Sequence, residues 1–209
     1  PQQGFLRAVR LLRDGVPNFD AYPFSIPAIR DLDELALDPK ITFFVGDNGS
    51  GKSTLIEAIA VVAGFNAEGG SKNFNFNTRA SESELHKFVR PVRSARRMQD
   101  GFFLRAESYF NVATEIERLD GGAGGSIIGA YGGVSLHEQS HGESFLAVAK
   151  HRFRNNGLYI LDEPEAALSP QRQLSLMIIM RDLIDDGGSQ FIIATHSPIL
   201  MALPQADIR

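Results

Sequence analysis

Eight consecutive residues, Gly46-Asp47-Asn48-Gly49-Ser50-Gly51-Lys52-Ser53, constrain the fold of this chain more than any other feature. They fit the pattern G-x-x-x-x-G-K-[ST] at every fixed position. The short β-branched and aromatic run from Ile41 to Val45 precedes them, and apolar residues recur at helical spacing from Ser53 to Ala63. The sequence therefore predicts a buried strand, a glycine-rich turn and a helix in succession, with Gly64 ending the helix.

A glycine-rich turn between a strand and a helix is suited to binding phosphate. Its glycines let successive backbone N–H groups point inward, and the helix N-terminus adds a partial positive charge. We expect Lys52 to reach the β- and γ-phosphates of a nucleotide, Ser53 to ligate Mg²⁺ and Thr54 to hydrogen-bond the α-phosphate. The backbone cradle comprises Asp47, Asn48, Gly49, Ser50 and Gly51. The alternative, a structural turn with a solvated lysine, is disfavoured by the flanking elements.

A second acidic site follows the apolar run from Leu158 to Leu161, which predicts another buried strand. Asp162 and Glu163 come directly after it, at the sheet edge where α/β proteins bind ligands. Asp162 is suited to hold Mg²⁺, and Glu163 is suited to orient and deprotonate the water that attacks a γ-phosphate. Two acids that merely cap the next helix are the structural alternative, which the phosphate-binding pattern makes less favourable.

Further strands are predicted at 102–106 and 190–194, and helices at 109–119, 144–153 and 170–184. This alternation indicates an α/β fold with a mainly parallel sheet and helices on both faces. A capping box at Ser81 to Glu84 predicts a helix that carries Arg90, Arg93, Arg96 and Arg97, with a possible kink at Pro91. Between the helices, the glycine-rich segment 121–133 is expected to be a mobile loop.

Composition bounds the class of protein. The length of 209 residues suits one domain, and no apolar run is long enough to span a membrane. The chain has no cysteine, which excludes disulfides and fits a reducing cytoplasm, and its net charge of −4 does not favour nucleic acid globally. The chain opens at Pro1 rather than Met, and a new strand begins near Ile208, which is compatible with truncation at both ends.

The order of these motifs resembles that of the ATP-binding cassette (ABC) ATPases over almost the whole chain. Gly46 to Thr54 resembles Walker A, and Asp162-Glu163-Pro164 resembles Walker B. Ala167-Leu168-Ser169 stands at the D-loop position, and Thr195-His196-Ser197-Pro198 resembles the switch-histidine loop. The resemblance implies a P-loop NTPase fold of ABC type in a single domain, 1–209, with a helical insertion at about 65–100. It also implies ATP and Mg²⁺ as ligands, and a histidine, His196, that hydrogen-bonds the γ-phosphate.

The signature motif is the least regular of the set. The family pattern is Leu-Ser-Gly-Gly-Gln, and this chain has Gln139-Ser140-His141-Gly142-Glu143. Ser140 and Gly142 match, whereas His141 replaces a glycine and Glu143 replaces the glutamine. The resemblance implies that Ser140, Gly142 and Glu143 contact the γ-phosphate bound by a second subunit, so that one chain alone is incomplete. A polar loop that caps the 144–153 helix is the alternative.

Two assignments stay open. The Q-loop position after the 102–106 strand holds Glu107, with Gln99 as the other candidate. Tyr22 or Phe24 could stack on an adenine base, but an aromatic residue entering a core strand would look the same.

The residues after Walker B resemble stand-alone ATPases related to RecF, the SMC proteins and the overcoming-lysogenization-defect nucleases more than transporter cassettes. The first hypothesis is a soluble ATPase that forms a homodimer around two Mg-ATP and acts as a conformational switch in DNA repair, chromosome maintenance or defence. The alternative is the ATP-binding subunit of a membrane transporter, with a membrane partner docked at 65–100. A third hypothesis, nucleic-acid binding by the four arginines, competes with a simple solvated helix face.

Overall fold

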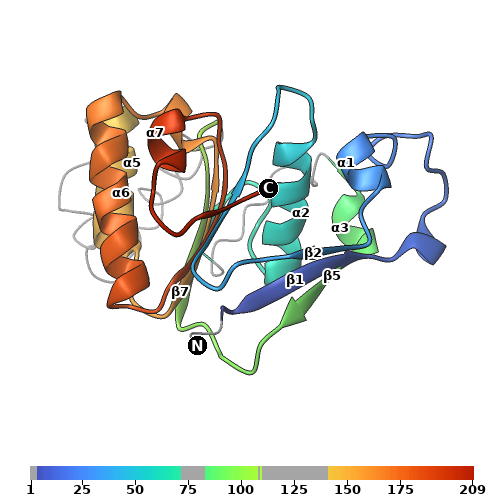
Figure 1. Ribbon diagram of the computed structural model, residues 1–209, viewed down its shortest axis with the longest axis horizontal. Helices are drawn as coiled ribbons and strands as arrows, with labels where there is room; N and C mark the ends of the chain where they lie inside the picture. Colours follow the sequence, from blue (N-terminus) through green and yellow to red (C-terminus); the bar gives the residue numbers. More distant parts are fainter. Residues whose placement is uncertain (1–3, 72–82, 108, 110–140) are drawn as a thin grey trace, which may run out of the picture.

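The computed structural model describes residues 4–71, 83–107, 109 and 141–209, and its centre is a six-stranded sheet (Figure 1). The strand order is β4-β6-β7-β8-β3-β9, and all neighbours are parallel except β4 and β6. In that order the strands are Gly70–Ser71, Asp100–Arg105, Gly157–Asp162, Gln190–Ala194, Ile41–Phe44 and Asp207–Ile208. The mainly parallel sheet expected from the sequence is confirmed.

Helices cover both faces of this sheet. Helices α5 (His141–Arg152), α6 (Pro170–Asp185) and α7 (Pro198–Met201) lie on one side, and α2 (Lys52–Ala63) lies on the other (Figure 1). Side chains alternate between the two cores along each central strand. In β7, for example, Tyr159 packs with the α5 and α6 side, whereas Ile160 packs with the α2 side. Both faces are buried, which explains the continuous apolar character of these strands.

A second, antiparallel sheet lies beyond α2 and was not predicted from the sequence. Its order is β2 (Glu34–Ala36), β1 (Leu6–Leu11) and β5 (Val89–Arg93). The short helices α1 (Pro27–Arg30) and α3 (Leu85–Phe88) and the 3-10 turn η1 (Arg13–Gly15) adjoin it. Its buried side chains join the core that α2 forms with the central sheet.

The predicted elements around the phosphate-binding pattern are present. Strand β3 and helix α2 flank it, and Gly64 ends α2 in the left-handed conformation with φ of 103°. Strands β6, β7 and β8 and helix α6 also lie where they were predicted, within a residue or two. Helix α5 begins at His141 rather than at residue 144, so Gly142 and Glu143 belong to its first turn.

The predicted arginine-bearing helix is wrong from Val89 onward. The helix α3 ends at Phe88, and the chain continues as β5, which pairs with β1. Val89 and Val92 favour a strand, and Pro91 is tolerated because β5 is an edge strand of its sheet. Among the described residues of the expected helical insertion at 65–100, only Leu85–Phe88 is helical beyond the end of α2.

The four arginines consequently do not share one exposed helix face. Arg93 donates a hydrogen bond to the backbone oxygen of Val62 at 2.8 Å. Arg96 lies over the ring of Phe5 at 4.6 Å and hydrogen-bonds Asn156. Arg90 donates to the backbone oxygens of Lys87 and Val89, each at 3.3 Å. Three of the four side chains are therefore engaged within the chain, which removes the pattern on which the nucleic-acid hypothesis rested.

Several predictions fall on residues outside the described ranges: Ser81 and Glu82 of the capping box, all but Tyr109 of the 109–119 helix, the glycine-rich segment 121–133, and Ser140. Within the ranges that are described, none of the helices has the length and hydropathy of a membrane span.

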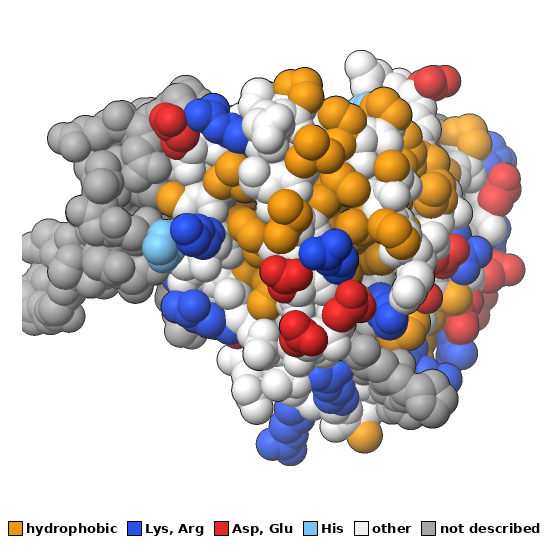
Figure 2. Space-filling model, turned by 60° about the vertical axis from the view of Figure 1, so that its left-hand side comes forward, with side chains coloured by type: hydrophobic (Ala, Val, Ile, Leu, Met, Phe, Trp, Pro, Cys, Tyr) orange, Lys and Arg blue, Asp and Glu red, His pale blue; other side chains and the backbone are white. Residues whose placement is uncertain are grey.

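Helix α6 carries apolar residues on its outer face as well as its inner face. Leu176 and Met180 are buried against the sheet, whereas Leu174 and Ile178 are 47% and 54% exposed. Figure 2 shows hydrophobic side chains gathered on the side of the molecule where α5, α6 and α7 come forward.

One buried glutamine joins the two sheets. Gln190, fully buried at the start of β8, accepts hydrogen bonds from the backbone N–H groups of Phe5 and Leu6 at 2.8 and 3.0 Å. Its amide donates to the backbone oxygens of Leu6 and Asp38, each at 2.8 Å. One side chain thus satisfies four backbone groups of the segments that lead into β1 and β3.

We predict that Gln190→Ala lowers the free energy of unfolding by about 3 kcal/mol, because four buried or partly buried backbone groups lose a side-chain hydrogen bond. Urea denaturation followed by circular dichroism measures the change. Gln171→Ala, at an exposed position of α6, is the control and should change stability by less than about 0.5 kcal/mol. Equal effects of the two substitutions would contradict the linking role of Gln190.

Candidate functional site

Four parallel strands end at the same edge of the central sheet and deliver the candidate residues there. Gly46 follows β3, and Glu107 follows β6. Asp162 ends β7, Glu163 comes directly after it, and His196 follows β8. Asp162 pairs in register with Ala194 of β8 and with Arg105 of β6. Parallel strands bring residues that are far apart in sequence to one edge, where ligands bind in α/β proteins.

The phosphate-binding pattern forms a turn that requires glycine. Gly49 and Gly51 adopt positive φ of 81° and 95°, in the region that favours glycine. A Cβ on Gly51 would also lie 2.8 Å from Cγ2 of Ile26, so a side chain there would collide. The helix α2 begins immediately afterwards, at Lys52. Backbone N–H groups at the helix start are thereby left available to an anion.

Lys52 is held inside the turn by the turn itself. Its ammonium donates to the backbone oxygens of Gly46 at 2.7 Å and Asp47 at 2.9 Å, and the residue is only 8% exposed. Nearby, the buried hydroxyl of Ser50 has no hydrogen-bond partner among the described residues. The turn therefore holds a desolvated cation and an unsatisfied hydroxyl close to the exposed helix start.

Ser53 and Asp162 meet between the two predicted sites. The Ser53 hydroxyl donates to Oδ1 of Asp162 at 3.0 Å, across 109 residues of sequence. Burial raises the pKa of Asp162 to about 6, and the nearby Arg105 guanidinium and the Ser53 hydrogen bond offset only part of this shift. The prediction that these two side chains lie together is supported by this contact.

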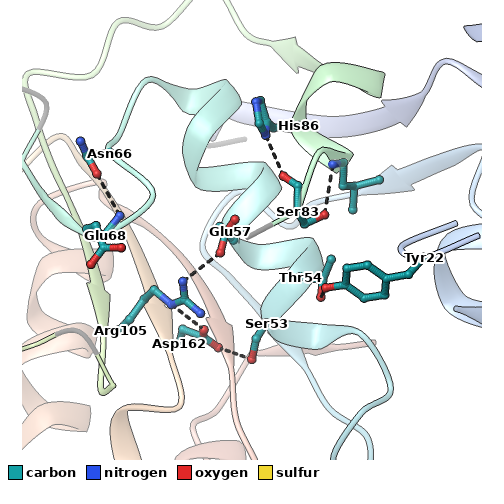
Figure 3. A network of polar contacts seen from close by, with 11 residues as sticks. Tyr22, Ser53, Thr54, Glu57, Asn66, Glu68, Ser83, His86, Arg105 and Asp162 are labelled. Carbon is teal, nitrogen blue, oxygen red and sulfur yellow. Dashed lines mark hydrogen bonds and ion pairs between the residues drawn. The ribbon is translucent and has the colours of Figure 1, made fainter. Parts of the chain in front are cut away.

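Two residues that sequence reasoning missed complete this cluster (Figure 3). Arg105, at the end of β6, lies 3.4 Å from Oδ2 of Asp162 and 2.8 Å from Oε2 of Glu57. Glu57 stands one helical turn after Ser53 on α2. A charged residue inside the apolar run of α2 was the available signal, because a buried carboxylate needs a cationic partner.

Glu163 and His196 lie together at the sheet edge. Nε2 of His196 is 3.3 Å from Oε1 of Glu163, and the two side chains are about one-third exposed. Glu163 has a left-handed backbone, with φ of 49°, which is uncommon for a residue with a side chain. Glu165 accepts a hydrogen bond from the backbone N–H of His196 at 2.5 Å. The loop after β8 is thereby tied to the 3-10 turn η3 (Pro164–Ala166) after β7.

A second link joins the same two loops through α6. Gln173 is buried on α6, where its amide donates to the backbone oxygen of Leu168 at 3.1 Å and its oxygen accepts from the Ser197 hydroxyl at 2.5 Å. Ser169 caps the start of α6. The D-loop and switch-histidine positions therefore share one buried polar side chain.

A cleft of about 420 Å³ opens over the phosphate-binding turn. Its lining residues are Tyr22, Ile26, Asn48, Gly49, Gly51, Lys52, Ser53, Thr54, Glu107 and Glu163. A neighbouring hollow of about 340 Å³ is lined by Ser53, Asp162, Glu163, Ala106, Glu107, Ala166 and Ala167. The two hollows share Ser53, Glu107 and Glu163. Lys52, Ser53, Thr54, Asp162 and Glu163 therefore border two adjoining hollows.

The structure bears on both assignments that the sequence left open. The Tyr22 hydroxyl lies 3.2 Å from the Thr54 hydroxyl at the cleft, whereas Phe24 is buried in the core between Phe19 and Phe88. Glu107 lines the cleft, whereas Gln99 precedes β6 and so lies at the opposite edge of the sheet. Of these four residues, Tyr22 and Glu107 line the cleft.

Gly142 and Glu143 lie elsewhere, on the first turn of α5. A Cβ on Gly142 would be 2.8 Å from the backbone oxygen of Ala167, so α5 approaches the D-loop position closely. Glu143 pairs with Arg172 of α6 at 3.1 Å. Neither residue is among those that line the cleft. Ser140 lies outside the described residues.

The donor set beside the turn fits a divalent cation. A serine hydroxyl and a carboxylate are hard oxygen ligands of the kind Mg²⁺ prefers, and they stand beside an anion-binding helix start. The described residues contain no cluster of three or more histidine, cysteine or acidic side chains that could hold a metal without a further ligand. The two ligands therefore fit a cation that also binds phosphate oxygens.

We predict that Asp162→Asn stabilises the nucleotide-free protein. The folded protein binds the Asp162 proton more tightly than the unfolded chain does, because the folded pKa is about 6 and the ordinary value is 3.8. The ionised carboxylate therefore destabilises the fold above about pH 6, and this cost vanishes towards pH 4. The variant should gain about 2 kcal/mol at pH 8 and progressively less below pH 6, as measured by urea denaturation. Exposed Asp14→Asn is the control, and a gain independent of pH would refute the prediction.

Comparisons with known proteins place the chain in a family. The model described as "AAA domain, putative AbiEii toxin, Type IV TA system" matches residues 89–202, and one described as "AAA domain" matches residues 18–124. The SMC head domain from Thermotoga maritima is 16% identical, with a TM-score of 0.44, over 82% of this chain and 86% of that one. No curated protein matches the sequence. Because each family model covers more than half of the 209 residues, the chain belongs to the AAA-domain family of P-loop ATPases.

Proposed function

We propose that this chain binds Mg-ATP in the cleft at the ends of β3, β7 and β8 and hydrolyses it. One observation supports the proposal above all others. The hydroxyl of Ser53, at the start of α2, and the carboxylate of Asp162, at the end of β7, lie 3.0 Å apart beside a turn built to bind phosphate. This is the arrangement that magnesium-dependent phosphoryl transfer requires of the protein.

The phosphate-binding turn performs the binding step. Backbone N–H groups from Asn48 to Ser53 would contact the phosphate oxygens, and Thr54 would contact the phosphate nearest the nucleoside. Lys52 would exchange its two bonds to backbone oxygens for bonds to phosphate, which replace neutral acceptors by charged ones. Tyr22 lies over the same cleft and would contact the nucleoside.

Ser53 and Asp162 would hold the magnesium ion, which when bound neutralises negative charge on the phosphate oxygens. Glu163 would accept a proton from the attacking water, since its carboxylate borders the cleft and, among the described residues, makes no ion pair with a lysine or an arginine. His196 would hydrogen-bond the terminal phosphate and transmit its presence to the loop after β8, which hydrogen bonds to Glu165 and Gln173 hold in place. In this proposal, hydrolysis would change the polar contacts of Glu163 and His196 at the ends of β7 and β8.

We further propose that two copies of this chain close around two Mg-ATP and reopen after hydrolysis. Gly142 and Glu143 support this because they belong to a helix start outside the cleft, at the position of a signature motif. A helix start presents a partial positive charge that suits a phosphate bound by another copy. The ATP-bound dimer would then act as a conformational switch.

We predict different effects from two substitutions in the site. Lys52→Ala should weaken ATP binding roughly 10- to 100-fold, because charge-assisted bonds to phosphate are lost. Glu163→Gln should keep ATP binding and lower turnover by at least about 100-fold, because the proton acceptor is lost. Calorimetry with Mg-ATP and phosphate release measure the two quantities. Lys40→Ala, which removes a lysine at the opposite end of β3, should change neither, and equal loss of binding in both site variants would contradict the roles.

The dimer makes a separate prediction. Glu163→Gln should trap ATP and elute as a dimer with Mg-ATP and as a monomer without nucleotide in size-exclusion chromatography with light scattering. The double variant Lys52→Ala/Glu163→Gln should stay monomeric under both conditions. A single variant that binds Mg-ATP by calorimetry but remains monomeric would overturn the dimer and leave the ATPase proposal standing.

A further inference from the structure

Arg105 occupies an unusual place for a cation, directly beside the proposed metal ligand. It stands in register with Asp162 on the neighbouring strand, and its side chain contacts Asp162 on one side and Glu57 on the other (Figure 3). The side chains of Arg105, Asp162 and Glu57 are only 11%, 6% and 4% exposed, in that order. Water therefore screens their charges weakly, and each charge strongly influences its neighbours.

The two contacts of Arg105 are not equivalent. Its terminal nitrogen donates to Glu57 at 2.8 Å. Its Nε faces Asp162 at 3.4 Å and, although buried, makes no hydrogen bond within the described residues. Arg105 is therefore anchored to Glu57 and acts on Asp162 through charge, while Oδ1 of Asp162 remains directed at Ser53.

The charges of this cluster bear on when a metal ion can bind. Without Arg105, Asp162 and Glu57 would be two buried negative charges near the Ser53 hydroxyl, and such oxygen ligands attract divalent cations. Arg105 supplies a positive charge between the two carboxylates, so the charges of these three side chains sum to −1, and Glu107 and Glu163 border the same hollow. A divalent ion that approaches without further anionic ligands meets this positive charge at close range.

We infer that Arg105 acts as a built-in counter-ion that keeps the Ser53 and Asp162 site from binding a divalent cation until nucleotide phosphates arrive. The phosphates bring negative charge that offsets the positive charge of Arg105, so metal and nucleotide enter together. Glu57 sets the strength of this effect, because it shares the charge of Arg105 with Asp162. The inference rests on the proposed Mg-ATP site and adds a residue that determines its nucleotide dependence.

A purely structural role for Arg105 predicts a different result. If Arg105 only stabilised the fold, its replacement would lower the free energy of unfolding without creating affinity for a metal ion in the absence of nucleotide. The measurement that distinguishes the two roles is therefore the binding of Mn²⁺ in the absence of nucleotide. Electron paramagnetic resonance of the free ion, or calorimetry, can monitor this binding.

We expect Arg105→Gln to bind Mn²⁺ without nucleotide at least about tenfold more tightly than the wild-type protein, because the positive charge between two buried carboxylates is removed. The double variant Arg105→Gln/Glu57→Gln should return to wild-type affinity. Arg97→Gln, at an exposed position, changes the net charge equally and should leave Mn²⁺ binding unchanged. A folded Arg105→Gln protein with wild-type Mn²⁺ affinity would overturn the inference.

Glu57→Gln gives an independent measurement in case Arg105→Gln does not fold. Removal of the Glu57 charge means that the positive charge of Arg105 beside Asp162 is no longer offset by Glu57. The Mg²⁺ concentration needed for half-maximal ATP binding should therefore rise at least about threefold. An unchanged Mg²⁺ requirement would also overturn the inference. Wild-type protein that bound no Mg-ATP at all would instead refute the proposed function, which separates the two failures.

Discussion

The candidate site depends on the hydrogen bond between Ser53 and Asp162, and the central sheet positions the two residues that form this bond. It joins the start of α2, the helix that follows β3, to the end of β7. Strands β3 and β7 are not adjacent, because β8 lies between them. Parallel pairing brings the ends of β3, β8 and β7 to one edge, and helices on both faces bury those strands. The polar groups therefore meet where the apolar layers end, which leaves them open to a ligand.

Charge in this site is balanced by the protein before any ligand arrives. Lys52 is satisfied by backbone oxygens of its own turn, and Asp162 and Glu57 share Arg105. The balance is incomplete, because Asp162 retains a raised pKa and Ser50 retains an unsatisfied hydroxyl. Such residual imbalance is typical of sites in which stability has been exchanged for function.

Local patterns were enough to predict the elements that carry the phosphate turn and the acidic strand end. Their strands are short and wholly apolar, and glycine marks the turn. The antiparallel sheet was missed because β1 and β2 owe their placement to distant partners, including the Gln190 side chain. The 89–93 segment was assigned to a helix because a capping pattern precedes it, whereas pairing with β1 decided its conformation. The contact of Arg105 with Glu57 could not be read from spacing, because it joins different elements.

The position of Tyr22 has a consequence for how this cleft can diversify. Its segment follows β1, which Gln190 joins to the central sheet, and precedes β2. The groups that would bind phosphate come from the central strands and α2. The part of the cleft that would face a nucleoside, which we call the wall, contains Tyr22. The part that would face the phosphates, which we call the floor, comes from the central strands and α2, so the two belong to different segments of the chain. Substitutions in the wall could change which base is accepted while the floor, and with it the chemistry of phosphate transfer, stays intact.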